Sequence, residues 1–193
     1  GYTKIHNKNF DLSYRLDGKT ITIRFEKELD IPFLHFVSLV YEVGMYPKWF
    51  PFCTAAETLK QPGKSKKLIY MIDNFPILSK RDFVLYGYGV NRLKENRTML
   101  LVVRSIDETS GIFQDYLKQK ENNKHVRGYI HIYAYEIKVI NRNKLVLRGM
   151  MNCDPKIKYV PQSLVNYIGK KVNYYNSVCR RPIYKNDKNF SKV

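Results

Sequence analysis

A single arginine stands at the head of a strand that is apolar on both of its faces. Residues 75–89 read FPILSKRDFVLYGYG, where Pro76 and Ser79 mark a turn and the strand begins at Arg81. The alternation of a strand gives two faces, one with Arg81, Phe83, Leu85 and Gly87 and one with Asp82, Val84, Tyr86 and Tyr88. We expect both faces to be covered. A guanidinium that enters such a strand needs a counter-charge, water or an anionic ligand, because a buried unpaired charge costs several kcal/mol.

The rest of the chain is read mainly as further strands. They are predicted at residues 5–14, 20–25, 54–59, 67–73, 98–106, 126–140 and 144–152, with an Asp17-Gly18 hairpin turn and a polar loop up to residue 123. Helical periodicity is confined to residues 30–44, with Asp30 as N-cap, and to residues 162–180. This pattern predicts an α+β fold in one domain, residues 1–193, with a loosely ordered tail at 182–193.

The charge balance favours anionic partners. Thirty-four Lys and Arg stand against 17 Asp and Glu, a formal charge of +17, and the cations are spread along the chain. Such a surface suits phospholipid membranes, nucleic acid or acidic proteins. The alternative reading is the codon bias of an AT-rich genome, since Asn, Lys, Ile and Tyr are all abundant. Three cysteines cannot all pair, which suggests a reducing compartment, and no stretch is long and apolar enough to span a membrane.

The sequence contains few features that are typical of an enzyme. No glycine-rich phosphate loop, nucleophile elbow or metal-ligand spacing occurs, so neither a metal nor another cofactor is expected. His131 lies within a predicted strand, where a structural histidine is the simpler reading. What remains is a set of charges inside apolar strands, above all Glu57, Arg81 and Arg104. They would either line a ligand cavity or form an internal ion pair such as Glu57 with Arg81.

A set of short blocks resembles the START domains, the lipid-transfer domains related to steroidogenic acute regulatory protein. The blocks follow the family order: 49–52 (WFPF), 56–59 (AETL), 68–70 (LIY), 76–84 (PILSKRDFV), 103–105 (VRS), 126–129 (VRGY), 154–155 (DP) and 160–166 (VPQSLVN). The resemblance implies a helix-grip fold, in which a curved antiparallel sheet wraps around a long C-terminal helix and encloses a lipid tunnel. It implies no reaction.

The resemblance also assigns roles to residues. Arg81 occupies the position that contacts the lipid phosphate, and Glu57 and Arg104 are expected at the polar end of the tunnel. The helix would present Val165, Ile168 and Val172 to the tunnel. Tyr135 is a candidate wall of an aromatic cage for a choline group, although tyrosines at alternate strand positions are more often core residues.

The loop after Asp154 departs from the family pattern. It has Ile157 where many members have glycine, and one extra residue before Pro161. Lys156, Ile157, Lys158 and Tyr159 give this loop apolar tips between cations, which suits contact with an anionic membrane surface. An ordinary solvated loop is the alternative.

These observations predict a non-enzymatic carrier of one phospholipid, with phosphatidylcholine or phosphatidylethanolamine favoured. A sterol or ceramide carrier of the same fold is the alternative, and a basic nucleic-acid-binding protein or a helix-grip enzyme is less favoured. We expect a monomer without specific nucleic-acid binding. The expected location is cytoplasmic with transient membrane association, unless a preceding segment directs export.

Overall fold

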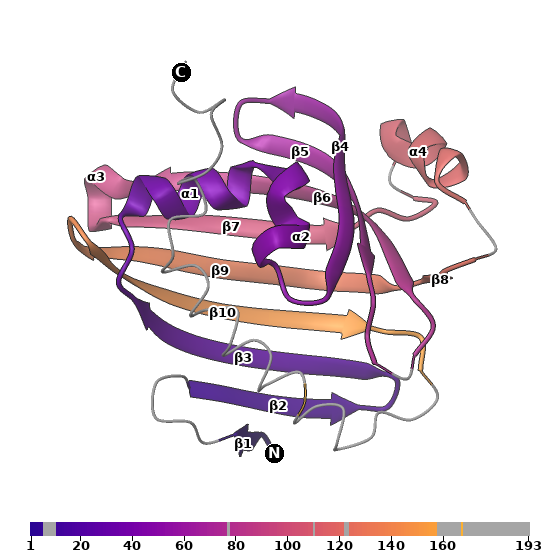
Figure 1. Cartoon of the computed structure of the whole chain (residues 1–193), viewed down its shortest axis with the longest axis horizontal. Coiled ribbons are helices and arrows are strands. Elements are labelled where there is room, and N and C mark those ends of the chain that lie inside the picture. Colours follow the sequence, from indigo (N-terminus) through magenta and orange to yellow (C-terminus); the bar gives the residue numbers. More distant parts are fainter. Residues whose placement is uncertain (6–10, 77, 110, 122–123, 158–166, 168–193) are drawn as a thin grey trace.

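One curved antiparallel sheet dominates the computed structural model, which describes residues 1–5, 11–76, 78–109, 111–121, 124–157 and 167 (Figure 1). The strand order is β1-β2-β3-β10-β9-β7-β6-β5-β4, and β8 pairs with β6 in parallel. The strands are β1 (Thr3–Ile5), β2 (Asp11–Asp17), β3 (Thr20–Leu29), β4 (Cys53–Gly63), β5 (Lys66–Asp73), β6 (Arg81–Arg92), β7 (Thr98–Ser105), β8 (Val126–Arg127), β9 (Tyr129–Asn141) and β10 (Lys144–Asp154). The predicted α+β class and curved sheet are confirmed.

Turn residues join neighbouring strands where the sequence predicted them. Gly18 has a φ of 57° in the β2–β3 hairpin, a conformation that glycine adopts without a steric cost. Between β9 and β10, the Asn141 side-chain oxygen accepts a hydrogen bond of 2.9 Å from the Asn143 backbone N–H.

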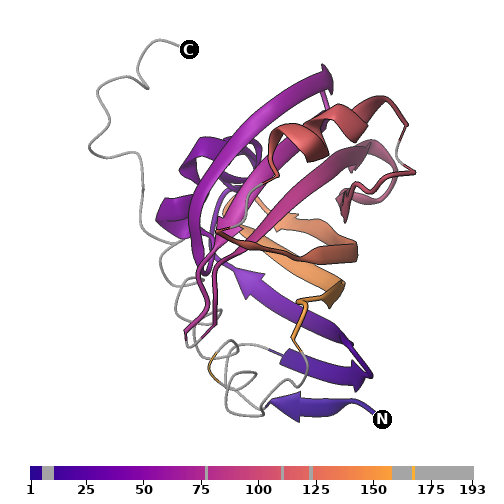
Figure 2. The same ribbon diagram turned by 90° about the vertical axis from the view of Figure 1, so that its right-hand side faces the viewer.

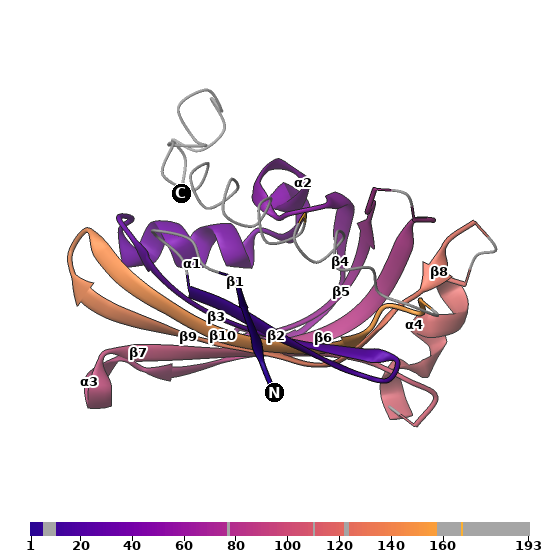
Figure 3. The ribbon, with the colours of Figure 1, turned by 90° about the horizontal axis from the view of Figure 1, so that it is seen from below.

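Two helical segments lie on the concave face of the sheet (Figure 3). They are α1 (Phe33–Tyr41) and, after the 3₁₀ turn η1 (Val43–Met45), the short α2 (Tyr46–Trp49). The predicted cap at Asp30 is wrong, because the helix starts after Pro32, whose extended backbone occupies the N-cap position. Apart from residue 167, the predicted helix over residues 162–180 lies outside the described residues.

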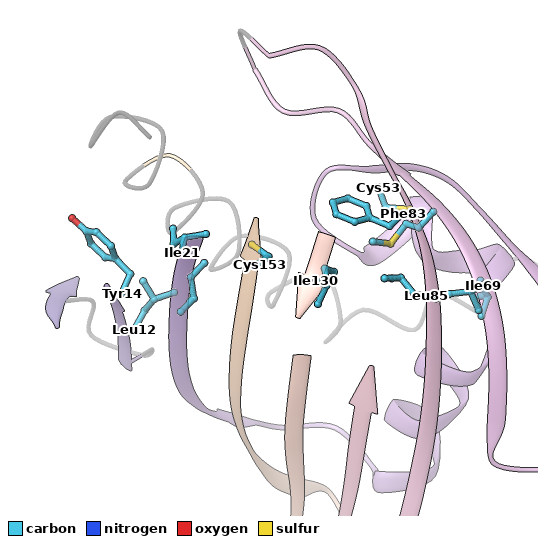
Figure 4. Close-up of a cluster of buried hydrophobic side chains, with 12 residues drawn as sticks. Leu12, Tyr14, Ile21, Cys53, Ile69, Phe83, Leu85, Ile130 and Cys153 are labelled. Carbon is cyan, nitrogen blue, oxygen red and sulfur yellow. The ribbon is translucent and has the colours of Figure 1, made fainter. Parts of the chain in front are cut away.

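The concave face carries most of the apolar core. One cluster draws on nearly the whole sheet, from Leu12 and Ile21 to Ile69 and Phe83 (Figure 4). A second cluster places Phe36 of α1 against the sheet. The concave-facing residues of the strands are apolar because this face of the sheet packs against the core.

The convex face is covered over part of the sheet. The 3₁₀ turn η2 (Gly111–Phe113) and helix α4 (Gln114–Gln119) lie next to the sheet there (Figure 2). Phe113 of this segment packs against Leu68 and Val84. This segment was predicted as a polar loop, and a short helix α3 (Leu93–Asn96) was also missed. The prediction that both faces of the Arg81 strand are covered is confirmed.

None of the helices in the described part of the chain has the length and apolar character that crossing a bilayer requires.

Candidate functional site

A cavity of about 210 Å³ lies on the concave face of the sheet. Strand residues of β3, β5, β6, β7, β9 and β10 line one side, and the segment from Tyr46 to Phe52 lines another. The described lining is almost wholly apolar or aromatic: Ile21, Ile23, Phe25, Tyr46, Trp49, Phe50, Pro51, Phe52, Ile69, Met71, Asp73, Phe75, Leu78, Arg81, Phe83, Leu85, Val103, Ile130, Tyr133, Tyr135, Met151, Cys153, Pro155 and Ile157.

A second cavity of about 280 Å³ continues beneath α1. It shares Tyr46, Ile69, Val103 and Tyr135 with the first cavity, so these four side chains form the partition between the two. Gly87 also lines the second cavity, and a Cβ there would lie 3.3 Å from Val103 Cγ2. The two cavities are therefore adjacent and separated only by these shared side chains.

Arg81 brings a guanidinium to the first cavity. Only 4% of the residue is exposed, and burial lowers its pKa. Its Nε donates a hydrogen bond of 3.2 Å to the Pro155 carbonyl, and Nη1 donates to the Ser79 carbonyl. Arg81 thus holds the loop before β6 to the loop after β10, and further guanidinium N–H groups remain for a ligand.

Asp73 lies opposite Arg81 in the β5–β6 register and also lines the cavity. It is 6% exposed, and its Oδ1 has no hydrogen-bond partner among the described residues. Burial raises the pKa of this carboxyl to about 7. Trp49 Nε1 is a second buried atom of the lining for which the described structure offers no partner. The described lining therefore includes a buried acceptor and a buried donor without a partner, in addition to the remaining N–H groups of Arg81.

The remaining titratable groups of the lining are held in their neutral forms. Burial raises the pKa values of the Tyr46 and Tyr135 phenols, and it raises those of Tyr133 and the Cys153 thiol to about 12. No group of three His, Cys, Asp or Glu within the described ranges is placed to hold a metal. The arrangement is suited to enclosing an apolar molecule and contacting its polar end.

No protein-family model matches the sequence, and no curated protein matches it either. Solved structures do match. Human StAR-related lipid transfer protein 5 is 16% identical, over 93% of this chain and 84% of its own, with a TM-score of 0.73. A STAR-related lipid transfer protein fragment from Xanthomonas axonopodis is 17% identical, over 94% and 99%, with a TM-score of 0.72. Human STARD10 is 15% identical, over 93% and 73%, with a TM-score of 0.73.

The chain has the START fold. The resemblance predicted from the ordered sequence blocks is therefore confirmed for the fold.

Within the START fold, the Arg-Asp pair of β6 splits between the two faces of the sheet. Arg81 points to the cavity, whereas Asp82, 1% exposed, points to the convex side. There Arg127 contacts both Asp82 oxygens, with Nε to Oδ1 at 2.9 Å and Nη2 to Oδ2 at 3.1 Å, and Tyr70 donates to Oδ2 at 3.0 Å. The VRGY block thus supplies the partner of Asp82, a role that the sequence analysis did not assign.

Two of the predicted ligand contacts lie away from the cavity. Glu57 is on the outer side of β4, where Lys120 Nζ approaches its Oε1 to 2.6 Å, so the considered Glu57–Arg81 ion pair is wrong. Arg104 is exposed and lies opposite Tyr86 on the convex side. The β-bulges of β4 and the pleat of β7 turn these side chains outward, which corrects their predicted position at the polar end.

Some of the other predicted site residues belong to the described part of the chain, and the rest do not. Tyr135 lines both cavities, as expected of a wall residue. Ile157 lines the first cavity, and exposed Lys156 pairs with Asp154 at 2.7 Å. The remaining candidates lie outside the described residues: Lys158, Tyr159, Val165, Ile168 and Val172.

The aromatic stretch 46–52 was read as a packed corner and is also part of the cavity wall. Tyr46 stacks on Phe50 at 5.6 Å between ring centroids, and Phe52 lies 4.8 Å from Phe75. Asp73 was not singled out at all. Its place at the end of a strand whose Ile69 and Met71 face inward was the available signal, because alternation puts Asp73 on the same face.

Proposed function

We propose that this protein is a non-enzymatic carrier that binds one phospholipid in the concave-face cavity and transfers it between membranes. The observation that carries the proposal is an apolar cavity with a buried guanidinium, Arg81, in its lining. The START fold supports it, since the structures that share this fold include proteins named for lipid transfer. No chemical step is part of the proposal.

The apolar lining supplies the affinity for the tails. Removing apolar surface from water contributes about 25 cal/mol per Å², or about 0.8 kcal/mol for each methylene. Ligand pockets for drug-sized molecules usually range from about 300 to 1,000 Å³. The first cavity is smaller than that, so two acyl tails require the second cavity and movement of the partition that includes Tyr46 and Tyr135.

Arg81 supplies the contact to the lipid phosphate. A guanidinium forms charge-assisted and often bidentate hydrogen bonds with phosphate oxygens. The two carbonyls that Arg81 already contacts fix its orientation before the ligand arrives. Tyr133 and Tyr135 of the same cavity offer aromatic faces to a choline or ethanolamine cation.

The loop after β10 is the proposed membrane contact. Ile157 borders the cavity, so this loop would be close to the lipid as it enters or leaves. The cations at Lys156 and Lys158, together with the formal charge of +17, would favour an anionic surface. We propose a monomer that works in the cytoplasm and associates with membranes only transiently.

Native mass spectrometry after incubation with mixed vesicles tests the function. The vesicles contain phosphatidylcholine, phosphatidylethanolamine, phosphatidylinositol, ceramide and sterol. A one-to-one phospholipid adduct is the expected result, and Arg81→Gln should reduce it at least about tenfold. Arg104→Gln is the matched control, because it removes a cation from the convex side.

The other outcomes revise the proposal in defined ways. A sterol or ceramide adduct in place of phospholipid would make this a carrier of a different lipid class. No adduct from a folded protein would contradict the carrier function altogether. Equal phospholipid capture by wild type and a folded Arg81→Gln variant would remove Arg81 from the site.

A further inference from the structure

Asp73 is a buried acidic group of the cavity lining, and its Oδ1 has no hydrogen-bond partner among the described residues. Its neighbours in the sheet are Cys53 on β4 and Arg81 on β6. Cys53 Sγ donates to the Ala55 carbonyl at 3.4 Å, and the hydrogen bonds of Arg81 go to Pro155 and Ser79. Among the described residues, neither neighbour forms an ion pair or hydrogen bond with Asp73.

A buried acceptor without a hydrogen-bond partner destabilises the protein unless a ligand donates a hydrogen bond to it. A buried polar atom without a partner costs about 1–3 kcal/mol. Asp73 Oδ1 is such an atom. Only 6% of the residue is exposed, and it lines the first cavity. Asp82, only one register step away on the opposite face, has both oxygens bonded. The sheet thus satisfies one buried aspartate and leaves the other open to the cavity.

We propose that Asp73 accepts a hydrogen bond from an N–H or O–H group of the bound lipid and thereby selects against lipids that lack one. The inference rests on the proposed carrier function and refines its ligand. Arg81 reads an anionic oxygen, whereas Asp73, opposite it in the register, reads a donor close to that oxygen. The matching ligand is a phospholipid with a hydrogen-bond donor near its phosphate.

The chemistry of common lipids makes this requirement selective. Phosphatidylcholine carries no N–H or O–H group, because its nitrogen is quaternary and its other polar atoms are acceptors. Phosphatidylethanolamine has three N–H donors in its headgroup. Sphingomyelin has the phosphocholine headgroup but carries an amide N–H and a hydroxyl in its backbone. The same recognition chemistry can therefore come from the headgroup or from the backbone.

A competition experiment separates these sources. Wild-type protein is equilibrated with vesicles that contain equal amounts of phosphatidylcholine, phosphatidylethanolamine and sphingomyelin with matched tails, and bound lipid is counted by native mass spectrometry. We expect at least about tenfold preference for one donor-bearing lipid over phosphatidylcholine, as sites built for a donor reject ligands without it. Enrichment of phosphatidylethanolamine assigns the donor to the headgroup, and enrichment of sphingomyelin assigns it to the backbone.

Variants link the preference to Asp73. Asp73→Leu should bring the ratio to within about twofold of unity while total capture persists, because the apolar side chain has no acceptor to leave unpaired. Asp73→Asn keeps one acceptor and should retain part of the preference. Glu57→Leu is the matched control, since it removes a carboxylate from the outer side of β4 and should leave the ratio unchanged.

The outcomes distinguish this inference from the function on which it rests. Efficient capture of phosphatidylcholine at parity with the other lipids would overturn the role of Asp73 and leave the carrier function standing. The same holds if Asp73→Leu, shown to be folded by circular dichroism, keeps the wild-type ratio. Capture of no lipid by wild type would overturn both.

Discussion

Two buried aspartates on adjacent strands differ in their hydrogen bonding, one on each face of the sheet. On the convex face, Asp82 receives hydrogen bonds from Arg127 and Tyr70. On the concave face, Asp73 has an oxygen without a partner in the described structure and lines a cavity. The convex face pairs its buried carboxylate within the fold, whereas the concave face leaves a carboxyl oxygen directed at a cavity.

The same contrast extends to other polar groups. On the outer side, the Tyr129 hydroxyl donates to Asp107 at 2.7 Å, and Lys120 pairs with Glu57. On the inner side, Trp49 Nε1 is as unpartnered as Asp73. Because unpartnered buried groups are few in folded proteins, two of them in the lining of one cavity distinguish this face from the convex face and support the proposed ligand site.

The largest effect is expected at the convex face, from Arg127→Met. Methionine retains an unbranched side chain but has no guanidinium, so the Asp82 carboxylate stays buried without its ion pair to Arg127. Breaking a fully buried pair from one side costs about 3–5 kcal/mol, and the 34% exposure of the Arg127 side chain places the expected loss at the lower end of that range. Urea unfolding followed by circular dichroism should show this loss in the free energy of unfolding.

Tyr70→Phe is the control for this prediction, because it removes one hydrogen bond from Asp82 and leaves Arg127 in place. It should cost about 1–3 kcal/mol. A loss below about 1 kcal/mol for Arg127→Met would mean that Asp82 does not depend on its partner, and the contrast between the two faces would fail.

The substitution Asp73→Asn is expected to raise the free energy of unfolding at alkaline pH, whereas Arg127→Met lowers it. Burial raises the pKa of Asp73 to about 7 in the folded protein, so between pH 4 and pH 7 the folded state holds a proton that the unfolded chain has lost. Wild-type stability should therefore fall as pH rises through this window, by up to about 1.4 kcal/mol per pH unit, and level off above it. The variant lacks this slope and should be more stable than wild type at pH 8.

The charged and titratable groups that face Asp73 across the sheet are Arg81 and Cys53. The pKa of Cys53 is raised to about 12 by burial and then by Asp73, so the thiol stays neutral throughout the window. If Arg81 instead stabilised the carboxylate, the wild type would lose stability on acidification relative to Asp73→Asn. That result would contradict the assignment of an open acceptor.

The sequence predicted the sheet well and the site in part. Alternation from Arg81 to Gly87 separated the two faces of β6 correctly, and the family resemblance at Arg81 indicated which face lines the cavity. The resemblance alone placed Glu57 at the polar end, and the structure turns it outward because a register shift between Cys53 and Ala55 changes which residues of β4 face inward, a feature that no local pattern predicts.

Long-range pairing was equally invisible in the sequence. Arg127 and Asp82 are 45 residues apart, and Asp73 becomes important only because its neighbours across the sheet use their donors elsewhere. Helix α4 was missed because it is short and mostly polar, and its apolar contacts with β5 and β6 exist only after the sheet forms.

A moderate effect is expected at Gly128, which joins β8 to β9. A Cβ at this position would lie 2.3 Å from Phe83 Cε1, and Phe83 lines the cavity. Gly128→Ala should therefore cost about 1–3 kcal/mol of stability, as overpacking does, and should reduce lipid capture by displacing the ring. Thermal unfolding and native mass spectrometry would measure the two effects together.

Gly44→Ala serves as the comparison, because a Cβ there meets nothing within 4 Å. It should change stability by no more than about 0.5 kcal/mol and leave capture unaffected. Equal behaviour of the two alanine variants would show that Phe83 moves freely and does not define the cavity.

The smallest effect is expected from Glu57→Gln, which probes an ion pair on the outer side. Lys120 Nζ is 2.6 Å from Glu57 Oε1, but the Glu57 side chain is 53% exposed, and such pairs contribute about 0–1 kcal/mol. Unfolding in low salt and in 1 M NaCl should reveal a small difference that salt removes, with lipid capture unchanged. A clear loss of lipid capture would instead bring Glu57 back to the ligand and weaken the division of roles between the two faces.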